Sequence, residues 1–155
     1  MREIIQSIKN LSIGFKSQDG REIAILKNIS TSINRGETVG IVGESGSGKS
    51  TLALAMMGFA KQGLYPISGE CIYKSKNLLD LSDRELEKIR GKQIAMIPQN
   101  AGQSLTPNLK IGYQVEETLK LHTKFDANER SIKITELLNK VRLPSPNIMA
   151  QRYPH

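Results

Sequence analysis

A glycine-rich loop in the first third of the chain constrains this sequence more than any other feature. The loop matches the pattern G-x-x-x-x-G-K-[S/T] at every fixed position and comprises Gly43, Glu44, Ser45, Gly46, Ser47, Gly48, Lys49, Ser50 and Thr51. The apolar residues 38–42 before it predict a buried strand of a parallel sheet, and residues 52–59 after it predict a helix buried on most sides. Strand, glycine loop and helix in this order are the context that the pattern requires for phosphate binding.

The residue types in the loop suit a nucleoside triphosphate. Gly46 and Gly48 lack side chains, so successive backbone N–H groups can wrap closely around a β-phosphate. Lys49 places an ammonium between the β- and γ-phosphates, and the Ser50 hydroxyl is a ligand for Mg²⁺. The Thr51 hydroxyl adds a contact to the α-phosphate. The loop therefore predicts that the chain binds ATP or a related triphosphate together with Mg²⁺.

The rest of the chain alternates strand and helix patterns without an internal repeat. Strands are expected at residues 4–15 and 22–26, joined by a turn at 18–20, and at residues 29–33, 69–73 and 94–97. Helices are expected at residues 83–90, 112–122 and 127–141, with one further turn at 148–153, and a polar loop at residues 98–109. Apart from residues 38–42, only residues 94–97 have the continuous apolar character of a second buried strand.

Composition excludes several classes of function. The apolar stretches reach about ten residues, far short of the roughly 20 that cross a bilayer, and the amino terminus lacks the pattern of a secretory signal. A cytoplasmic location is expected. The net charge of +7 comes from dispersed Lys and Arg and the chain has no Trp, so nucleic acid is not an expected partner. Cys71 is the only cysteine and is expected to be a buried small side chain.

The glycine loop alone fits kinases, GTPases, helicases and transporter ATPases. Together with Ile97, Pro98 and Gln99 about fifty residues later, it resembles the ATP-binding subunits of ABC importers. Residues 78–82, 90–97, 104–107 and 153–155 are similar to the branch that serves uptake of peptides, nickel and metallophores. The resemblance implies an α/β fold with a P-loop NTPase core, an antiparallel β region at 1–37, the core at 38–99, and the Q-loop with the start of a helical subdomain at 100–155.

The resemblance also assigns roles to two residues outside the glycine loop. Gln99 matches the glutamine that contacts Mg²⁺ and the attacking water and couples the site to the membrane subunits; the alternative is a polar residue that merely ends a buried strand. Phe15 matches the aromatic residue that stacks on adenine; the alternative is a core role, which is common at the end of a strand. Pro98 departs from the pattern, in which an apolar residue such as Phe usually precedes the glutamine.

The implied partners are transmembrane permease subunits and a second ABC ATPase subunit, in a homodimer or heterodimer, at the inner face of the cell membrane. The signature, Walker B, D-loop and switch histidine of the family have no match in these 155 residues, and neither His122 nor His155 lies where the switch is expected. Three explanations for the missing motifs stay open: the sequence is a fragment, it comes from a frameshifted or degenerate gene, or it is one half of a split ATPase. We expect the 155-residue polypeptide by itself not to hydrolyse ATP.

Two other functions stay open at this point. One is an inactive ATP-binding fragment or regulatory adaptor of a transporter. The other is a different P-loop ATPase such as a DNA-repair relative, although a long coiled-coil insertion would then be expected after Gln99. His122 is expected on a helix surface. The resemblance further implies that both neighbours of the strand at 38–42 come from sequence beyond the signature, which leaves that strand without a backbone partner here.

Overall fold

The computed structural model describes residues 3–17, 19–58 and 63–155. The chain divides into two compact units, Met1–Glu87 and Lys88–His155, and each is described by itself. Gln18, which begins a predicted turn, and Phe59, which ends a predicted helix, lie outside the described residues.

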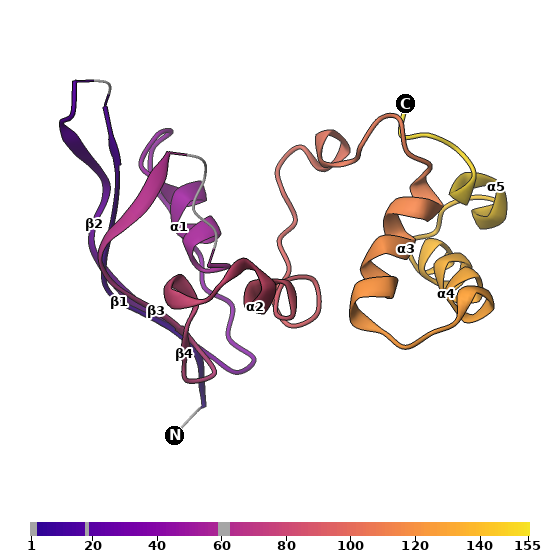
Figure 1. Cartoon of the computed structure of the whole chain (residues 1–155), viewed down its shortest axis with the longest axis horizontal. Helices are drawn as coiled ribbons and strands as arrows, with labels where there is room; N and C mark the ends of the chain where they lie inside the picture. Colours follow the sequence, from indigo (N-terminus) through magenta and orange to yellow (C-terminus); the bar gives the residue numbers. More distant parts are fainter. Residues whose placement is uncertain (1–2, 18, 59–62) are drawn as a thin grey trace. The chain divides into compact units, whose positions relative to one another are not determined.

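The first unit is built on an antiparallel sheet with the strand order β2-β1-β3-β4 (Figure 1). Its strands are β1 (Ile4–Lys16), β2 (Glu22–Asn34), β3 (Leu64–Tyr73) and the short β4 (Lys76–Asn77). The predicted hairpin is confirmed, and the strand predicted at 29–33 is the continuation of β2. Because β1 is central, its buried side chains form the core of the unit, with Ile8, Leu11 and Ile13 at most 3% exposed.

Short helices complete the first unit. These are α1 (Lys49–Ala55), a 3₁₀ turn η1 (Leu78–Asp80) and α2 (Asp83–Glu87), which ends three residues earlier than predicted. Leu52 and Ala55 of α1 are buried, and the Gln6 side chain of β1 donates to the Met56 carbonyl that follows the helix. Cys71 is fully buried as predicted. Burial also raises the pKa of its thiol, which keeps it protonated.

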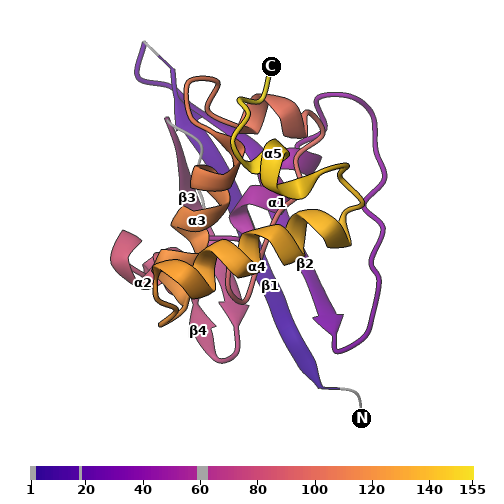
Figure 2. The same cartoon turned by 90° about the vertical axis from the view of Figure 1, so that its right-hand side faces the viewer.

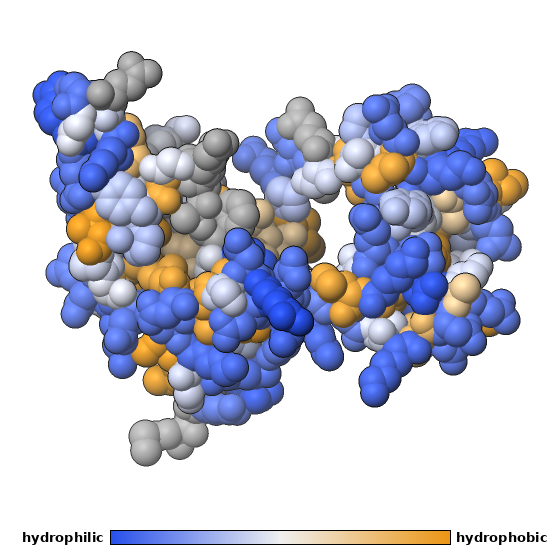
Figure 3. All heavy atoms as spheres, viewed as in Figure 1, coloured by the Kyte–Doolittle hydropathy of each residue, from blue (hydrophilic) through white to orange (hydrophobic). Residues whose placement is uncertain are grey.

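Two predicted strands are absent, and those two predictions are wrong. Residues 38–42 form no strand, and the Val42 side chain is 96% exposed. At 94–97 only Ile94 makes an isolated bridge, to Arg90, while Ile97 is 92% exposed. Backbone N–H and C=O groups of a strand need a neighbouring strand, and among the described residues no strand lies in a sheet with either segment. Figure 3 shows apolar side chains at the surface of both units, between hydrophilic ones.

The second unit is helical after a loop that contains the 3₁₀ turn η2 (Ala101–Ser104). It consists of α3 (Ile111–His122), α4 (Ala127–Lys140) and α5 (Pro146–Ala150). The predicted helices at 112–122 and 127–141 are confirmed to within one residue, and the last predicted turn is displaced toward residue 146. Figures 1 and 2 show α3 and α4 crossing, with α5 beside them. No helix among the described residues has the length and apolarity needed to span a bilayer.

A capping box defines the start of α4. The Asp126 side chain accepts from the Glu129 amide over 2.9 Å, and the Glu129 side chain accepts from the Asp126 amide over 2.8 Å. These bonds satisfy two of the donors that a helix leaves free at its amino end. Ile134 and Leu138, one turn apart on the same face, are the buried residues of this helix. His122 ends α3 and is half-buried.

Candidate nucleotide-binding site

The glycine loop is closed by its own lysine. The Lys49 ammonium donates to the Gly43 carbonyl at 2.8 Å, to the Glu44 carbonyl at 2.6 Å and to the Ser47 hydroxyl at 3.3 Å. An ammonium has three N–H groups, so each is engaged across the mouth of the loop. The lysine thus holds a positive charge in the space that the loop encircles.

Backbone conformation explains two of the glycines. Gly46 and Gly48 have φ of 82° and 89°, in the left-handed region that only glycine adopts without strain. At Gly48 space matters as well, because an added Cβ would lie 2.7 Å from Leu26 Cδ2. Gly48 therefore brings the start of α1 against β2, and β2 fixes the position of the loop.

The hydroxyl residues lie where α1 begins. Lys49 is the first helical residue, preceded by Gly48 at the N-cap position without a side-chain cap. Ser50 is exposed and Thr51 half-buried, so the Ser50 hydroxyl is open to a ligand. Glu44 and Ser45 are exposed residues of the loop. A triphosphate is suited by this combination of an uncapped helix start, a glycine-rich loop and a lysine. The exposed hydroxyl beside them offers the kind of oxygen ligand that Mg²⁺ prefers.

Phe15 lies near the end of β1, paired with Ile23 of β2 and Leu64 of β3. Its side chain is half-buried and lines a shallow hollow with Lys16, Ser17, Asp19, Arg21 and Ile23. The neighbouring guanidinium of Arg21 lowers the pKa of Asp19 to about 2. An aromatic face reached from solvent is compatible with stacking on a base as well as with a partly buried edge of the core.

Gln99 belongs to the second unit, whereas the glycine loop belongs to the first. It is exposed, follows the half-buried Pro98, and begins the loop that leads through η2 to α3. The structure describes the two units separately, so the joint role of Gln99 and the glycine loop stays a prediction.

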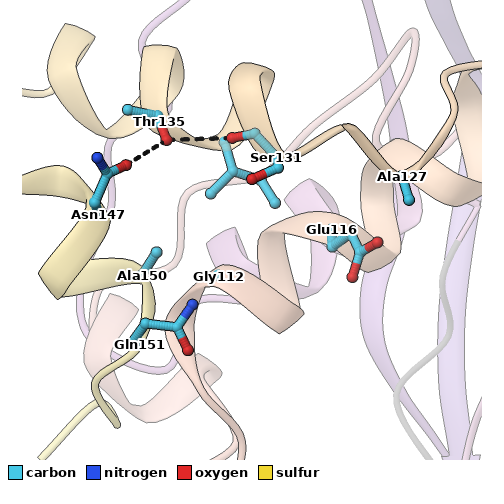
Figure 4. Close-up of a pocket in the computed structure, with 9 residues that line it drawn as sticks. Gly112, Glu116, Ala127, Ser131, Thr135, Asn147, Ala150 and Gln151 are labelled. Carbon is cyan, nitrogen blue, oxygen red and sulfur yellow. Dashed lines mark hydrogen bonds between the residues drawn. The ribbon is translucent and has the colours of Figure 1, made fainter. Parts of the chain in front are cut away.

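A hollow of the helical unit holds no comparable arrangement. It encloses about 410 Å³ between α3, α4 and α5 (Figure 4). The Thr135 hydroxyl donates to Asn147 over 2.8 Å, and Glu116 is paired with Arg130 and Lys120. Since these polar groups already have protein partners, nothing in the hollow points to a ligand.

The sequence reasoning missed Gln114, which binds the loop before α3 with its side chain. Its amide joins three backbone groups of Thr106 and Leu109 at 2.8 to 3.0 Å. A glutamine in the first turn of a helix gives no sequence signal of its own. The only available hint was Pro107, which favours a turn just before the helix.

The protein-family model described as ABC transporter matches residues 26–154. Because the match covers most of the sequence and includes the glycine loop, the chain belongs to the ABC transporter family, and the predicted family is confirmed. It is 38% identical over 157 residues to the dipeptide transport ATP-binding protein DppD of Lactococcus lactis subsp. cremoris. It is 41% identical over 149 residues to the oligopeptide transport ATP-binding protein OppD of Haemophilus influenzae.

These alignments cover 99% and 96% of this chain but 44% and 45% of the two relatives, so the chain spans less than half of their length. Among solved structures, the dimeric ATP-binding cassette MJ0796, in a post-hydrolysis state bound to ADP and Pi, superposes with a TM-score of 0.80 at 30% identity. The alignment covers 96% of this chain and 61% of that cassette. The predicted fold class, a partial P-loop NTPase domain of the ABC type, is confirmed.

Proposed function

We propose that this chain is the ATP-binding part of the nucleotide-binding subunit of an ABC importer, in which binding and hydrolysis of ATP energise solute uptake. The observation that carries the proposal is the glycine loop, with Lys49 held across it by the Gly43 and Glu44 carbonyls. Peptides are the favoured solutes because relatives are named for dipeptide, oligopeptide and glutathione transport. Nickel and metallophores remain in the proposed class on the strength of the sequence resemblance.

In this proposal Lys49 exchanges its two carbonyl partners for oxygens of the β- and γ-phosphates. The amides around Gly46 and Gly48 donate to the β-phosphate, and Thr51 contacts the α-phosphate. Phe15 stacks on the adenine. The Ser50 hydroxyl and the Gln99 amide oxygen are the residues that would hold Mg²⁺, which supplies neutralisation of the charge on the phosphates.

The proposed partners are transmembrane permease subunits and a second ATPase subunit, with the protein in the cytoplasm at the inner face of the membrane. The solved cassette with a TM-score of 0.80 is dimeric. The loop from Gln99 to Leu109 is proposed as the contact with the permease, since its residues with described side chains are exposed except Leu109. Exposed loops on a rigid scaffold are the usual sites of such contacts.

Calorimetry with Mg·ATP tests the proposal. Lys49→Ala removes the ammonium from the glycine loop, and a charge-assisted bond of this kind contributes about 1.5–3 kcal/mol, so binding should fall at least tenfold. Lys76→Ala, at an exposed lysine of β4, is the matched control and should bind like the wild type. Equal affinity of Lys49→Ala and wild type would refute the nucleotide site.

A further inference from the structure

One side chain holds the turn that ends the loop after Gln99. Residues 106–109 form a β-turn in which the Leu109 N–H donates to the Thr106 carbonyl over 3.2 Å, with Pro107 at the second position. Gln114 Oε1 accepts from the Thr106 N–H at 2.8 Å. Gln114 Nε2 donates to the Thr106 carbonyl at 3.0 Å and to the Leu109 carbonyl at 2.9 Å. The carboxamide thus uses both of its N–H groups and its oxygen on this single turn.

The helix that carries Gln114 is completed by the last residues of the chain. The first amides of a helix have no partner inside it, and Lys110 at the N-cap position of α3 supplies no side-chain bond. The Ile111 N–H instead donates to the Arg152 carbonyl over 2.9 Å. The Lys110 ammonium also donates to Gln151 Oε1 at 3.1 Å. Residues 151–152 therefore cap α3 from outside.

Gly112 lets these two segments meet. It is buried in the first turn of α3, and an added Cβ would lie 2.8 Å from the Ala150 carbonyl oxygen and 3.0 Å from Ala150 Cβ. Figure 4 shows Gly112 next to Ala150 and Gln151. At the other side, Pro107 and Asn108 of the turn line one hollow of about 290 Å³ with Tyr153 and His155. The turn, the first turn of α3 and residues 150–155 thus form one cluster.

We propose that Gln114 is a positioning residue that ties the 106–109 turn to α3 and, through the first turn of α3, sets the place of residues 150–153. Packed interiors transmit displacement because they have few voids, so a partner that moves the turn moves the carboxy-terminal segment with it. This inference rests on the proposed function only in taking that partner to be the permease.

Amide hydrogen exchange in the full chain, followed by NMR, tests the role of Gln114. Gln114→Met has a similar length and removes all three hydrogen bonds, while Gln114→Ala also removes the packing. In both variants the Thr106 and Ile111 amides should exchange about fivefold to tenfold faster. This is the loss of protection expected when an amide loses one hydrogen bond. Glu117→Ala, at an exposed position of the same helix, is the matched control and should change neither amide.

Unchanged exchange of Thr106 in Gln114→Met would overturn the positioning role. So would a loss of protection throughout α3 in that variant, since Gln114 would then support the helix and not the turn. Faster exchange at Thr106 with no change at Ile111 would overturn the link to residues 150–153.

Cysteine cross-linking in the assembled transporter separates this inference from the proposed function. Cys71 is fully buried, so a cysteine introduced as Asn108→Cys is the accessible thiol among the described residues. It should cross-link to the permease, with a lower yield after Gln114→Met. If no cross-link forms while Thr106 exchange still depends on Gln114, the permease contact is refuted and the positioning role stands. If the cross-link forms with equal yield in both chains and Thr106 exchange is unchanged, the positioning role is refuted and the permease contact stands.

Discussion

At the scale of single residues, charge pairing distinguishes Glu116 from an ordinary surface carboxylate. Glu116 Oε1 accepts from Arg130 Nε at 2.9 Å, and its other oxygen lies 3.1 Å from the Lys120 ammonium. The hydrogen bond to Arg130 is the main cause that lowers the pKa of Glu116, and Lys120 adds to it. The bridge joins α3 to α4, the two longest helices of the second unit.

The pKa of Glu116 should rise toward 4.5, its ordinary value, in Arg130→Ala, and less in Lys120→Ala. Arg130 is 17% exposed and Lys120 46%, so water screens the lysine more. Because the folded-state pKa is lowered, the bridge stabilises the unit above the ordinary value and this contribution is lost as pH falls through the lowered pKa. A carboxyl NMR titration measures the shift. Identical titration curves in wild type and Arg130→Ala would contradict it.

Residue identities could be predicted from sequence where backbone chemistry dictates them. The glycine loop is one case, because positive φ at Gly46 and Gly48 and a lysine at the next position follow from phosphate geometry. Gln114 is the opposite case. Its role depends on a turn and a helix start that meet only in the folded unit, and a glutamine at that position fits a solvated helix face equally well.

At the scale of elements, the first unit depends on a bulge in its central strand. Between the pairs Lys9↔Glu70 and Ser12↔Ser68, β1 has two residues where β3 has only Gly69. The Asn10 amide, at φ of 49°, donates to the Ser30 hydroxyl of β2 over 2.9 Å. The bulge turns Leu11 fully into the core. Strand existence was predictable from the apolar residues. The bulge was not predicted, and its trace in the sequence is a shift of the apolar alternation between Ile8 and Leu11, which are three positions apart.

Gly69→Ala should destabilise the chain by more than the backbone cost alone. Gly69 has φ of +88°, and an added Cβ would clash with the Asn10 carbonyl oxygen. Gly63, at φ of +85° with nothing within 4 Å, is a matched control that isolates the left-handed conformation. That cost is about 1–2 kcal/mol, and crowding against backbone should add about 1–3 kcal/mol at Gly69. Urea unfolding followed by circular dichroism compares the two. Equal losses of unfolding free energy in Gly69→Ala and Gly63→Ala would show that β1 moves away from the added methyl group without cost.

At the scale of the whole molecule, the limits of prediction follow from sheet pairing. The strands predicted at 38–42 and 94–97 have the apolar residues of buried strands, yet Val42 and Ile97 are almost fully exposed. Burial of a parallel strand depends on neighbours on both sides, and the described residues supply none for either segment. The helices of the second unit were predictable because their hydrogen bonds are local. The pairing of a strand is not local, so residue pattern alone did not determine it.

Binding and turnover of ATP should separate in a polypeptide of these 155 residues. Hydrolysis needs a positioned water, a carboxylate that orients or deprotonates it, and Mg²⁺ held by a second protein ligand besides the serine of the loop. Ser50 is the proposed metal ligand in the glycine loop, and the Walker B aspartate and catalytic glutamate that the family resemblance implies have no match in these 155 residues. General-base catalysis alone often raises a reaction rate by roughly 10²–10⁴-fold.

We therefore expect the 155-residue polypeptide to release phosphate no faster than its Lys49→Ala variant, which is the control for contaminating ATPases. A longer chain that carries the signature and Walker B segments should be active. Phosphate release by the 155-residue polypeptide near that of the longer chain, and lost in Lys49→Ala, would show that a residue within this sequence performs the work of the catalytic carboxylate.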